Sequence, residues 1–150
     1  MTAAGILLAA TLALGGSVPA VGAAAARERD LLGALDRAGI TTLYSEYWTC
    51  NRLSYASSER IACAVLTDDL RPGWDRYQPL VARVRADPHR AYAFPAGTPV
   101  DQAFRACLAA HAVVPTVSDR AGYHVYRLPG PLDPSRDCAA TPGAHPSSSR

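Results

Sequence analysis

The pattern of apolar and polar positions predicts three amphipathic helices in the central part of the chain. Apolar residues recur every three or four positions in the ranges 25–38, 77–86 and 98–111, so each range has one apolar face. Gly39 follows the first range and suits the left-handed end of a helix. Thr98 and Pro99 open the third range as a hydroxyl cap followed by proline at the first helical position.

Five short runs that favour extended structure are predicted as strands. They cover residues 41–48, 60–66, 91–94, 112–117 and 123–128. The second run is uninterrupted and apolar, which is typical of a strand buried on both faces of a parallel sheet. The last run alternates in polarity, as a strand with one solvated face does. Residues 119–122 form a turn that joins the last two strands into a hairpin.

This order of elements predicts a small layered α/β sandwich with a mostly parallel sheet and a C-terminal antiparallel hairpin, preceded by an apolar N-terminal helix. Residues 49–58 leave two interpretations open. A short helix there would make a strand–helix–strand unit. A loop would let the flanking strands pair antiparallel, with Cys50 opposite Cys63.

The two ends of the chain differ from its centre. Residues 1–26 carry no charged side chain and form an apolar run long enough to cross a bilayer, so we expect a membrane helix or a signal-like segment there. Residues 129–150 are rich in proline and serine, which predicts a disordered tail. The folded α/β domain is therefore predicted to span residues 27–128.

The spacing of the four cysteines predicts disulfides rather than a metal or redox motif. Cys50, Cys63, Cys107 and Cys138 include no Cys-x-x-Cys pair, and an even number behind an export-like segment is typical of an oxidising compartment. Three pairings are possible, of which Cys50–Cys63 with Cys107–Cys138 is the most local. Buried free thiols at Cys63 and Cys107 are the alternative.

Charge and motifs exclude several classes of function. The net charge of +2 comes with no basic block, which argues against a nucleic-acid partner. No glycine-rich turn follows the first strand, and no Gly-x-Ser-x-Gly or His-Glu-x-x-His motif is present, so we predict no cofactor and no catalytic residue. The four histidines are isolated in the sequence, and we predict no metal site.

One cluster of residues has the chemistry of a carbohydrate site. In a strand over 41–48, Tyr44, Glu46 and Trp48 would share one face. Aromatic surface beside carboxylate and guanidinium groups provides the apolar platform and the hydrogen bonds that a sugar requires. The full candidate set is Tyr44, Glu46, Trp48, Arg52, Arg60 and Trp74. Alternatively, Tyr44 and Trp48 pack under a helix while Glu46 pairs with Arg52 or Arg60.

An ordered series of short motifs gives the chain a resemblance to a known family. The motifs are Tyr44-Ser45-Glu46-Tyr47-Trp48, Arg52-Leu53, Ser58-Glu59-Arg60-Ile61, Arg76-Tyr77 and Tyr92-Ala93-Phe94. Residues 30–128 resemble the C-terminal soluble domain of multi-pass membrane proteins related to the protein mannosyltransferases, within the GT-C class of lipid-phosphosugar-dependent glycosyltransferases. The resemblance implies an outward-facing accessory domain. The catalytic acids of that class lie between early membrane helices, so no catalytic residue carries over to this chain.

The sequence therefore leaves three hypotheses for the function. The first is an extracytoplasmic accessory domain tethered to the cell membrane through residues 1–26, with glycan or a membrane glycosyltransferase as its partner. The second is a secreted module that binds carbohydrate or peptide through Tyr44, Glu46, Trp48, Arg52 and Trp74. The third is a small hydrolase, which would need a serine or cysteine beside a histidine.

Overall fold

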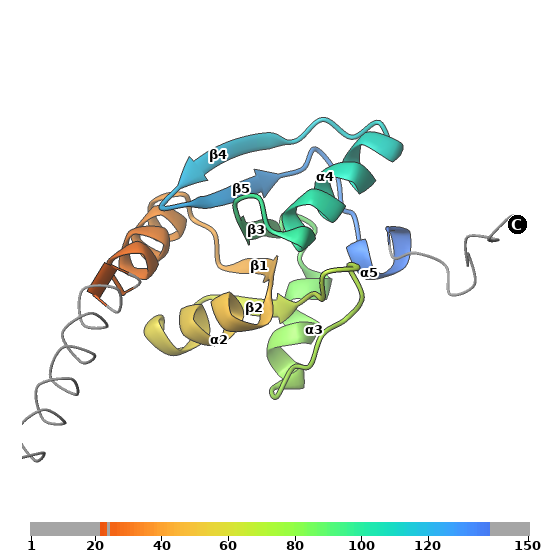
Figure 1. Ribbon diagram of the computed structural model, residues 1–150. Coiled ribbons are helices and arrows are strands. Elements are labelled where there is room, and N and C mark those ends of the chain that lie inside the picture. The colour runs from red at the N-terminus through yellow and green to blue at the C-terminus, as the bar shows by residue number, and fades with distance from the viewer. Residues whose placement is uncertain (1–21, 24, 139–150) are drawn as a thin grey trace, which may run out of the picture.

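A five-stranded sheet with the strand order β2-β1-β3-β5-β4 lies at the centre of the computed structural model, which describes residues 22–23 and 25–138 (Figure 1). The strands are β1 (Thr42–Ser45), β2 (Ala62–Val65), β3 (Ala91–Pro95), β4 (Thr116–Arg120) and β5 (Tyr123–Arg127). β1 pairs in parallel with β2 and β3, whereas β5 pairs antiparallel with β3 and β4. The predicted α/β class, the parallel strands and the C-terminal hairpin are confirmed.

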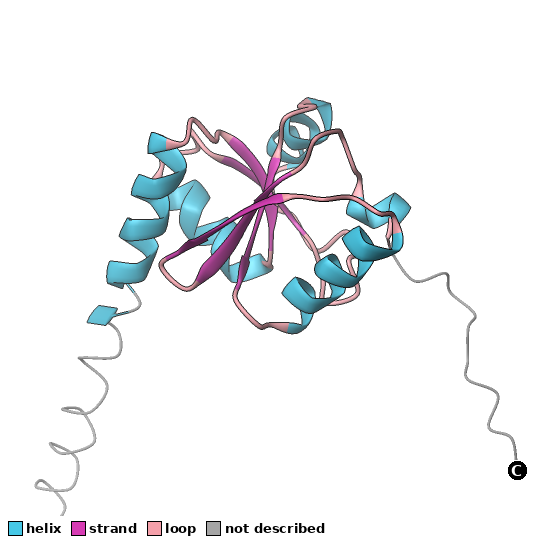
Figure 2. Ribbon diagram, turned by 90° about the horizontal axis from the view of Figure 1, so that it is seen from above, coloured by secondary structure: helices cyan, strands magenta, loops and turns pink. Residues whose placement is uncertain are grey.

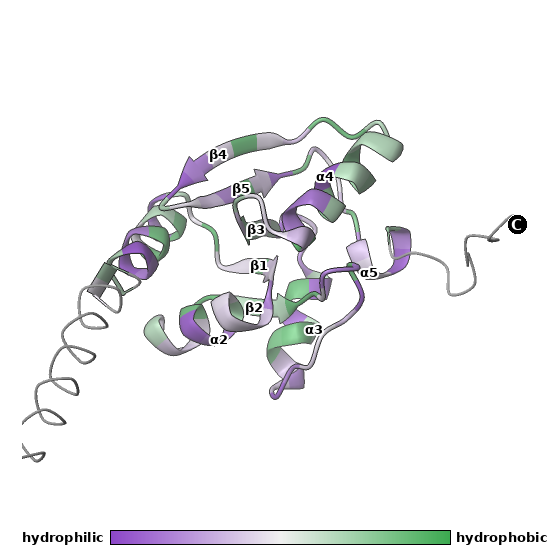
Figure 3. Cartoon of the chain, viewed as in Figure 1, coloured by the Kyte–Doolittle hydropathy of each residue, from purple (hydrophilic) through white to green (hydrophobic). Residues whose placement is uncertain are grey.

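Helices cover both faces of this sheet (Figure 2). They are a helix over residues 25–37, α2 (Tyr47–Ala56), α3 (Gln78–Ala86), α4 (Pro99–Ala110) and a short α5 (Pro134–Asp137). Leu31 and Leu35 of the first helix share one core with Leu53 of α2, while Val84 of α3 and Phe104 of α4 belong to the core on the opposite face. Figure 3 shows apolar residues interspersed with polar ones along α3 and α4, as their predicted amphipathic pattern requires.

The two disulfides join a helix to a neighbouring element. Cys50 on α2 is bonded to Cys63 on β2, and Cys107 on α4 is bonded to Cys138 just after α5. The most local of the three pairings is therefore confirmed. Residues 49–58 lie largely within α2, so the strand–helix–strand interpretation holds, and the local disulfide forms without antiparallel pairing of β1 and β2.

Three predicted boundaries are wrong. The strand predicted over 41–48 ends at Ser45, because Glu46 caps α2. The strand predicted over 112–117 begins only at Thr116. Ala112 has a positive φ of 51° and the Val113 amide donates back to the Leu108 carbonyl, so the start of the predicted run belongs to the end of α4. Residues 129–138 are not a disordered tail: the Leu132 carbonyl accepts hydrogen bonds from Tyr92 and from Arg90 in the interior.

Most of the predicted N-terminal segment 1–26 lies outside the described residues, as do residues 139–150. Among the residues that the structure describes, no helix is both long enough and apolar enough to cross a membrane.

Candidate functional site

Three aromatic side chains gather at the carboxyl ends of β1 and β2. α2 begins directly after β1, and a long loop follows β2 (Figure 1). Tyr47 and Trp48 are the first two residues of α2, and Trp74 belongs to that loop. The Tyr47 ring stacks on Trp74 with 6.2 Å between centroids and meets Trp48 edge-on at 5.1 Å. We call Tyr47, Trp48 and Trp74 the aromatic face. In parallel α/β sheets, ligands bind beyond the carboxyl ends of the strands.

The aromatic face is open to solvent. Trp48 is 64% exposed and Trp74 is 63% exposed. The guanidinium carbon of Arg76 lies 4.9 Å from the Trp74 ring centroid, within the range of a cation–π contact. Single exposed apolar residues are ordinary, but a cluster of large ones bordered by charge is typical of a binding surface.

A hollow of about 330 Å³ borders the aromatic face. Its lining includes Glu46, Tyr47, Thr67, Asp68, Gly73 and Trp74. Asp68 is exposed, and its carboxylate makes no hydrogen bond or ion pair with any residue that the structure describes. The hollow therefore combines apolar rings with a carboxylate that is available to accept hydrogen bonds.

Gly73 fixes the loop that carries Trp74. A Cβ atom at this position would lie 2.3 Å from a side-chain carbon of Val65, so only glycine lets the loop approach β2 this closely. The Gly73 amide donates to the Val65 carbonyl at 2.8 Å, and the Asp75 carboxylate accepts from the Val65 amide at 3.1 Å. Burial raises the pKa of Asp75. These two hydrogen bonds hold the loop that carries Trp74 against the end of β2.

Glu46 caps the start of the helix that carries Tyr47 and Trp48. Its two carboxylate oxygens each accept a hydrogen bond at 2.7 Å, one from the Trp48 amide and one from the Thr49 amide. This satisfies two of the unpaired donors at the start of α2. Glu46 therefore positions Trp48 and is not a free ligand group.

Replacing Glu46 with alanine is expected to lower the free energy of unfolding by about 1 kcal/mol, since two amides at the helix start lose their acceptor. The midpoint of urea unfolding measures this loss. Glu59→Ala is the matched control and should change stability by less than about 0.5 kcal/mol, because Glu59 is exposed and its side chain makes no hydrogen bond with any described residue. Equal midpoints for the two variants would contradict the capping role.

The structure brings together only part of the predicted site. Tyr44 is 3% exposed and stacks on Tyr92 in the core at a centroid distance of 5.7 Å. Arg60 pairs with Asp36 at 3.0 Å. Arg52 is exposed on α2 and lines a different hollow. The predicted shared face of Tyr44, Glu46 and Trp48 is therefore wrong, whereas Trp48 and Trp74 do lie in one cluster.

The alternative interpretation of the same residues is confirmed only for Tyr44, which packs within the core. Trp48 is exposed, and Glu46 pairs with neither Arg52 nor Arg60. The candidate set predicted from the sequence did not include Tyr47 or Arg76. The predicted strand over 41–48 would have turned the Tyr47 side chain away from that of Trp48. Recognising Glu46 as the start of a helix would have placed Tyr47 and Trp48 together.

A second polar cluster joins α4 to β5. The Asp101 carboxylate, 1% exposed, accepts hydrogen bonds from the Tyr126 hydroxyl at 2.5 Å, the Gly97 amide at 2.9 Å and the His124 Nδ1 at 2.8 Å. His124 Nε2 lies 3.2 Å from the Asp119 carboxylate. Burial alone would raise the pKa of Asp101, but these hydrogen bonds outweigh it and hold that pKa below its usual range.

The hydrogen bonds of this second cluster link α4 to β5 and indicate a structural role. Burial is the main cause that raises the pKa of Tyr126 to about 12, so its hydroxyl stays protonated and donates to Asp101. His124 is held by Asp101, Asp119 and Arg105. Among the described residues, no serine or cysteine side chain hydrogen-bonds to a histidine ring, which is the arrangement a serine or cysteine hydrolase would use.

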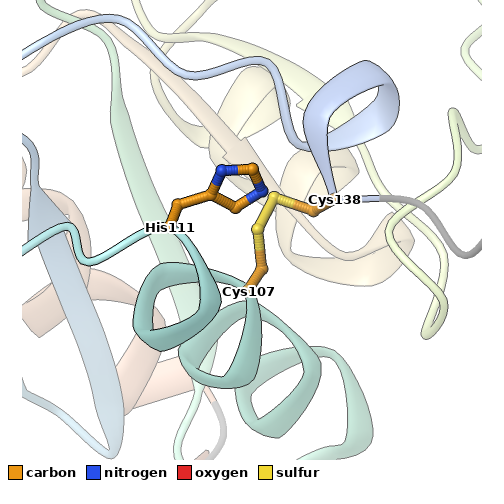
Figure 4. Close-up of side chains that lie close together, drawn as sticks. All are labelled: Cys107, His111 and Cys138. Atoms are coloured by element: carbon orange, nitrogen blue, oxygen red, sulfur yellow. A yellow bond between two sulfur atoms is a disulfide. The ribbon is translucent and has the colours of Figure 1, made fainter.

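A third cluster contains Cys107, His111 and Cys138, whose potential ligand atoms all lie within 4.8 Å of one another (Figure 4). The two sulfurs are bonded to each other, and metal ions bind the thiolate form. The His111 Nε2 lies 3.0 Å from the Asp137 carbonyl oxygen. In its disulfide form this cluster ties α4 to α5.

The three clusters differ in what they offer a ligand. The acids of the second are occupied by internal partners, and the sulfurs of the third are bonded to each other. The aromatic face alone combines exposed apolar surface with an adjoining hollow, so it is the candidate site. Comparisons of the chain with protein-family models, with curated proteins and with solved structures find no match.

Proposed function

We propose that this chain is an extracytoplasmic carbohydrate-binding domain whose binding surface is the aromatic face. The observation that carries the proposal is the pair of exposed indoles at the carboxyl edge of the parallel strands, beside a hollow that is lined in part by the carboxylate of Asp68. A sugar ring has apolar C–H surfaces and a rim of hydroxyl groups. Aromatic rings pack against the former, while carboxylate and guanidinium groups hydrogen-bond to the latter.

The energetics support a ligand on this surface. Leaving more than half of each indole in water forgoes on the order of 2–3 kcal/mol that burial would supply. The rings are held by each other, by the Glu46 cap and by the Gly73 loop, so little side-chain entropy is lost when a ligand covers them. Asp68 and Arg76 stand beside the rings as polar groups for orientation.

The disulfides support the proposed location, since such bonds persist outside the cytosol. In this proposal the apolar segment 1–26 exports the domain or holds it at the outer side of the cell membrane. The resemblance to the soluble domain of mannosyltransferase-like proteins gives the domain an accessory role, in which it holds glycan beside a membrane glycosyltransferase.

Binding to an array of oligosaccharides tests the proposal. The wild-type chain is expected to retain a defined set of glycans, and Trp48→Ala or Trp74→Ala should weaken each interaction by about tenfold or more, as loss of a central aromatic contact does. Tyr55→Ala is the matched control, since Tyr55 is an 89% exposed aromatic residue of α2 that lies outside the cluster.

Two outcomes of that comparison would overturn the proposal. One is an array on which the wild-type chain binds nothing. The other is binding that Trp48→Ala and Trp74→Ala leave at the level of Tyr55→Ala.

A further inference from the structure

A second hollow, of about 270 Å³, lies between the helix over 25–37 and the β4–β5 hairpin. Its apolar floor contains the buried side chains of Leu35, Ile40 and Val125. Thr116 and Ser118 of β4 also line it, and they pair with Arg127 and Val125 of β5, so all four share one face of the sheet. None of the residues of the aromatic face lines this hollow.

Three arginines border the hollow without an acidic partner. They are Arg37, Arg120 and Arg127, all exposed, and none forms an ion pair with any residue that the structure describes. Arg120 and Arg127 donate only to backbone carbonyls, those of Asp119 and Ala38. Each guanidinium keeps further N–H donors that have no acceptor among the described residues.

The rest of the chain supplies no carboxylate side chain to compensate them. All thirteen aspartate and glutamate residues lie between Glu28 and Asp137, within the described part of the chain. The neighbouring acids are engaged elsewhere, Asp36 with Arg60 and Asp119 with His124. No aspartate or glutamate side chain therefore pairs with the three arginines, which leaves their guanidinium groups available to an anionic ligand.

We propose that this hollow binds an anionic amphiphile: a phosphate group on the arginines, joined to an apolar chain that covers Leu35, Ile40 and Val125. Three guanidinium forks and the hydroxyls of Thr116 and Ser118 offer more donors than the two oxygens of a carboxylate can accept, whereas a phosphate has at least three acceptor oxygens. Neither hydroxyl makes a hydrogen bond within the described residues, so both are available to the ligand.

Calorimetric titration of the full chain with n-octyl phosphate tests the proposal, with inorganic phosphate as the ligand that lacks an apolar chain. Saturable binding of octyl phosphate is expected, and inorganic phosphate should bind about tenfold or more weakly because it leaves the floor uncovered. Amide NMR signals of residues 34–40 and 116–127 should shift. The indole signals of Trp48 and Trp74 should stay in place, which separates this site from the aromatic face.

Arginine variants complete the test. Arg37→Gln/Arg120→Gln is expected to weaken octyl phosphate binding by about tenfold or more, since two charge-assisted contacts are lost. Arg29→Gln/Arg52→Gln removes the same charge from exposed residues that do not line the hollow, and should leave binding unchanged. Equal weakening by both variants, equal affinity for both phosphates, or shifts outside the stated residues would overturn the proposal.

Vesicles distinguish a membrane lipid from a soluble phosphate ester as the source of the ligand. For a lipid headgroup, the wild-type chain should bind vesicles that contain phosphatidic acid more tightly than vesicles of pure phosphatidylcholine. The Arg37→Gln/Arg120→Gln variant should then lose this preference. If only octyl phosphate binding depends on these arginines, the ligand is a soluble ester. Either result supports the site, and independence from the arginines in both arms would overturn it.

Discussion

Replacing Asp101 with asparagine is expected to lower the free energy of unfolding by about 3 kcal/mol. The carboxylate is buried on α4 and accepts hydrogen bonds from three donors: Tyr126, His124 and the Gly97 amide. An asparagine amide of the same size has only one oxygen acceptor, and its NH2 group would face donors. The loss comes from buried donors left without an acceptor. Urea unfolding followed by circular dichroism measures it.

Asp119→Asn is the matched control for this prediction. Asp119 is the other carboxylate on His124, but its side chain is 86% exposed, so the variant should lose less than about 1 kcal/mol. If the two variants were equally stable, the joint between α4 and β5 would contribute far less than its burial and hydrogen bonds indicate.

Acid should remove the advantage of Asp101. Its pKa is lower in the folded protein than the 3.8 of the free side chain, so the folded state favours the charged form. The resulting stabilisation is complete above pH 3.8 and is lost as the pH falls through the folded pKa. The stability difference between wild type and Asp101→Asn should therefore shrink as the pH is lowered from about 5 to about 2. A difference that stayed constant would contradict this assignment.

The double variant Cys107→Ser/Cys138→Ser is expected to lose about 3–4 kcal/mol of stability. The bond joins residues 31 positions apart and so restricts a long loop of the unfolded chain. It also holds α5, with the buried Leu132 just before it, against α4 and β3. For a domain of this size the melting temperature should fall by about 15–25 °C, which scanning calorimetry measures.

Cys50→Ser/Cys63→Ser is the comparison for the loss of the Cys107–Cys138 disulfide. Its loop spans only 13 positions, so the expected loss is about 3 kcal/mol, somewhat less than for the longer loop. Limited proteolysis adds a local test, since only loss of Cys107–Cys138 should expose the chain between residues 128 and 138. Undiminished protection there would show that Leu132 and Arg90 hold this segment without the disulfide.

The fold was largely predictable because its signals are local. The apolar run over 60–66 matches β2, and the Thr98-Pro99 start matches the beginning of α4. The strand after Gly39 was extended too far because Tyr47 and Trp48 have high strand propensity. The capping bonds of Glu46 to two backbone amides outweigh that propensity, and this is why the helix begins within the predicted strand.

The candidate site was predictable only in part, because it depends on contacts between distant residues. Trp48 and Trp74 were predicted from their chemistry, but the stacking of Tyr47 on Trp74 depends on the close approach of the Gly73 loop to β2. The carbohydrate-site prediction placed Tyr44 on a binding face with Glu46 and Trp48, whereas the alternative packed it under a helix. β1 lies between two parallel strands with helices on both sides, so each of its faces is buried.

The Asp101 cluster and the arginine-lined hollow had no sequence signal of their own. Asp101 and His124 are 23 positions apart and meet only because α4 packs across β5. Arg37, Arg120 and Arg127 look like ordinary surface residues in a chain whose fifteen basic residues are all arginine. Their lack of acidic partners becomes visible only when the sheet is assembled.

The most direct test of the proposed function maps a retained glycan onto the protein by NMR. In a titration of the full chain with an oligosaccharide selected from the array, we expect the indole signals of both tryptophans and the amides of residues 46–48, 67–68 and 73–76 to shift saturably. The amides beside Arg37 and Ser118 should stay in place. Saturable binding that leaves both indoles unmoved and shifts signals elsewhere would contradict the assignment of the aromatic face as the carbohydrate site.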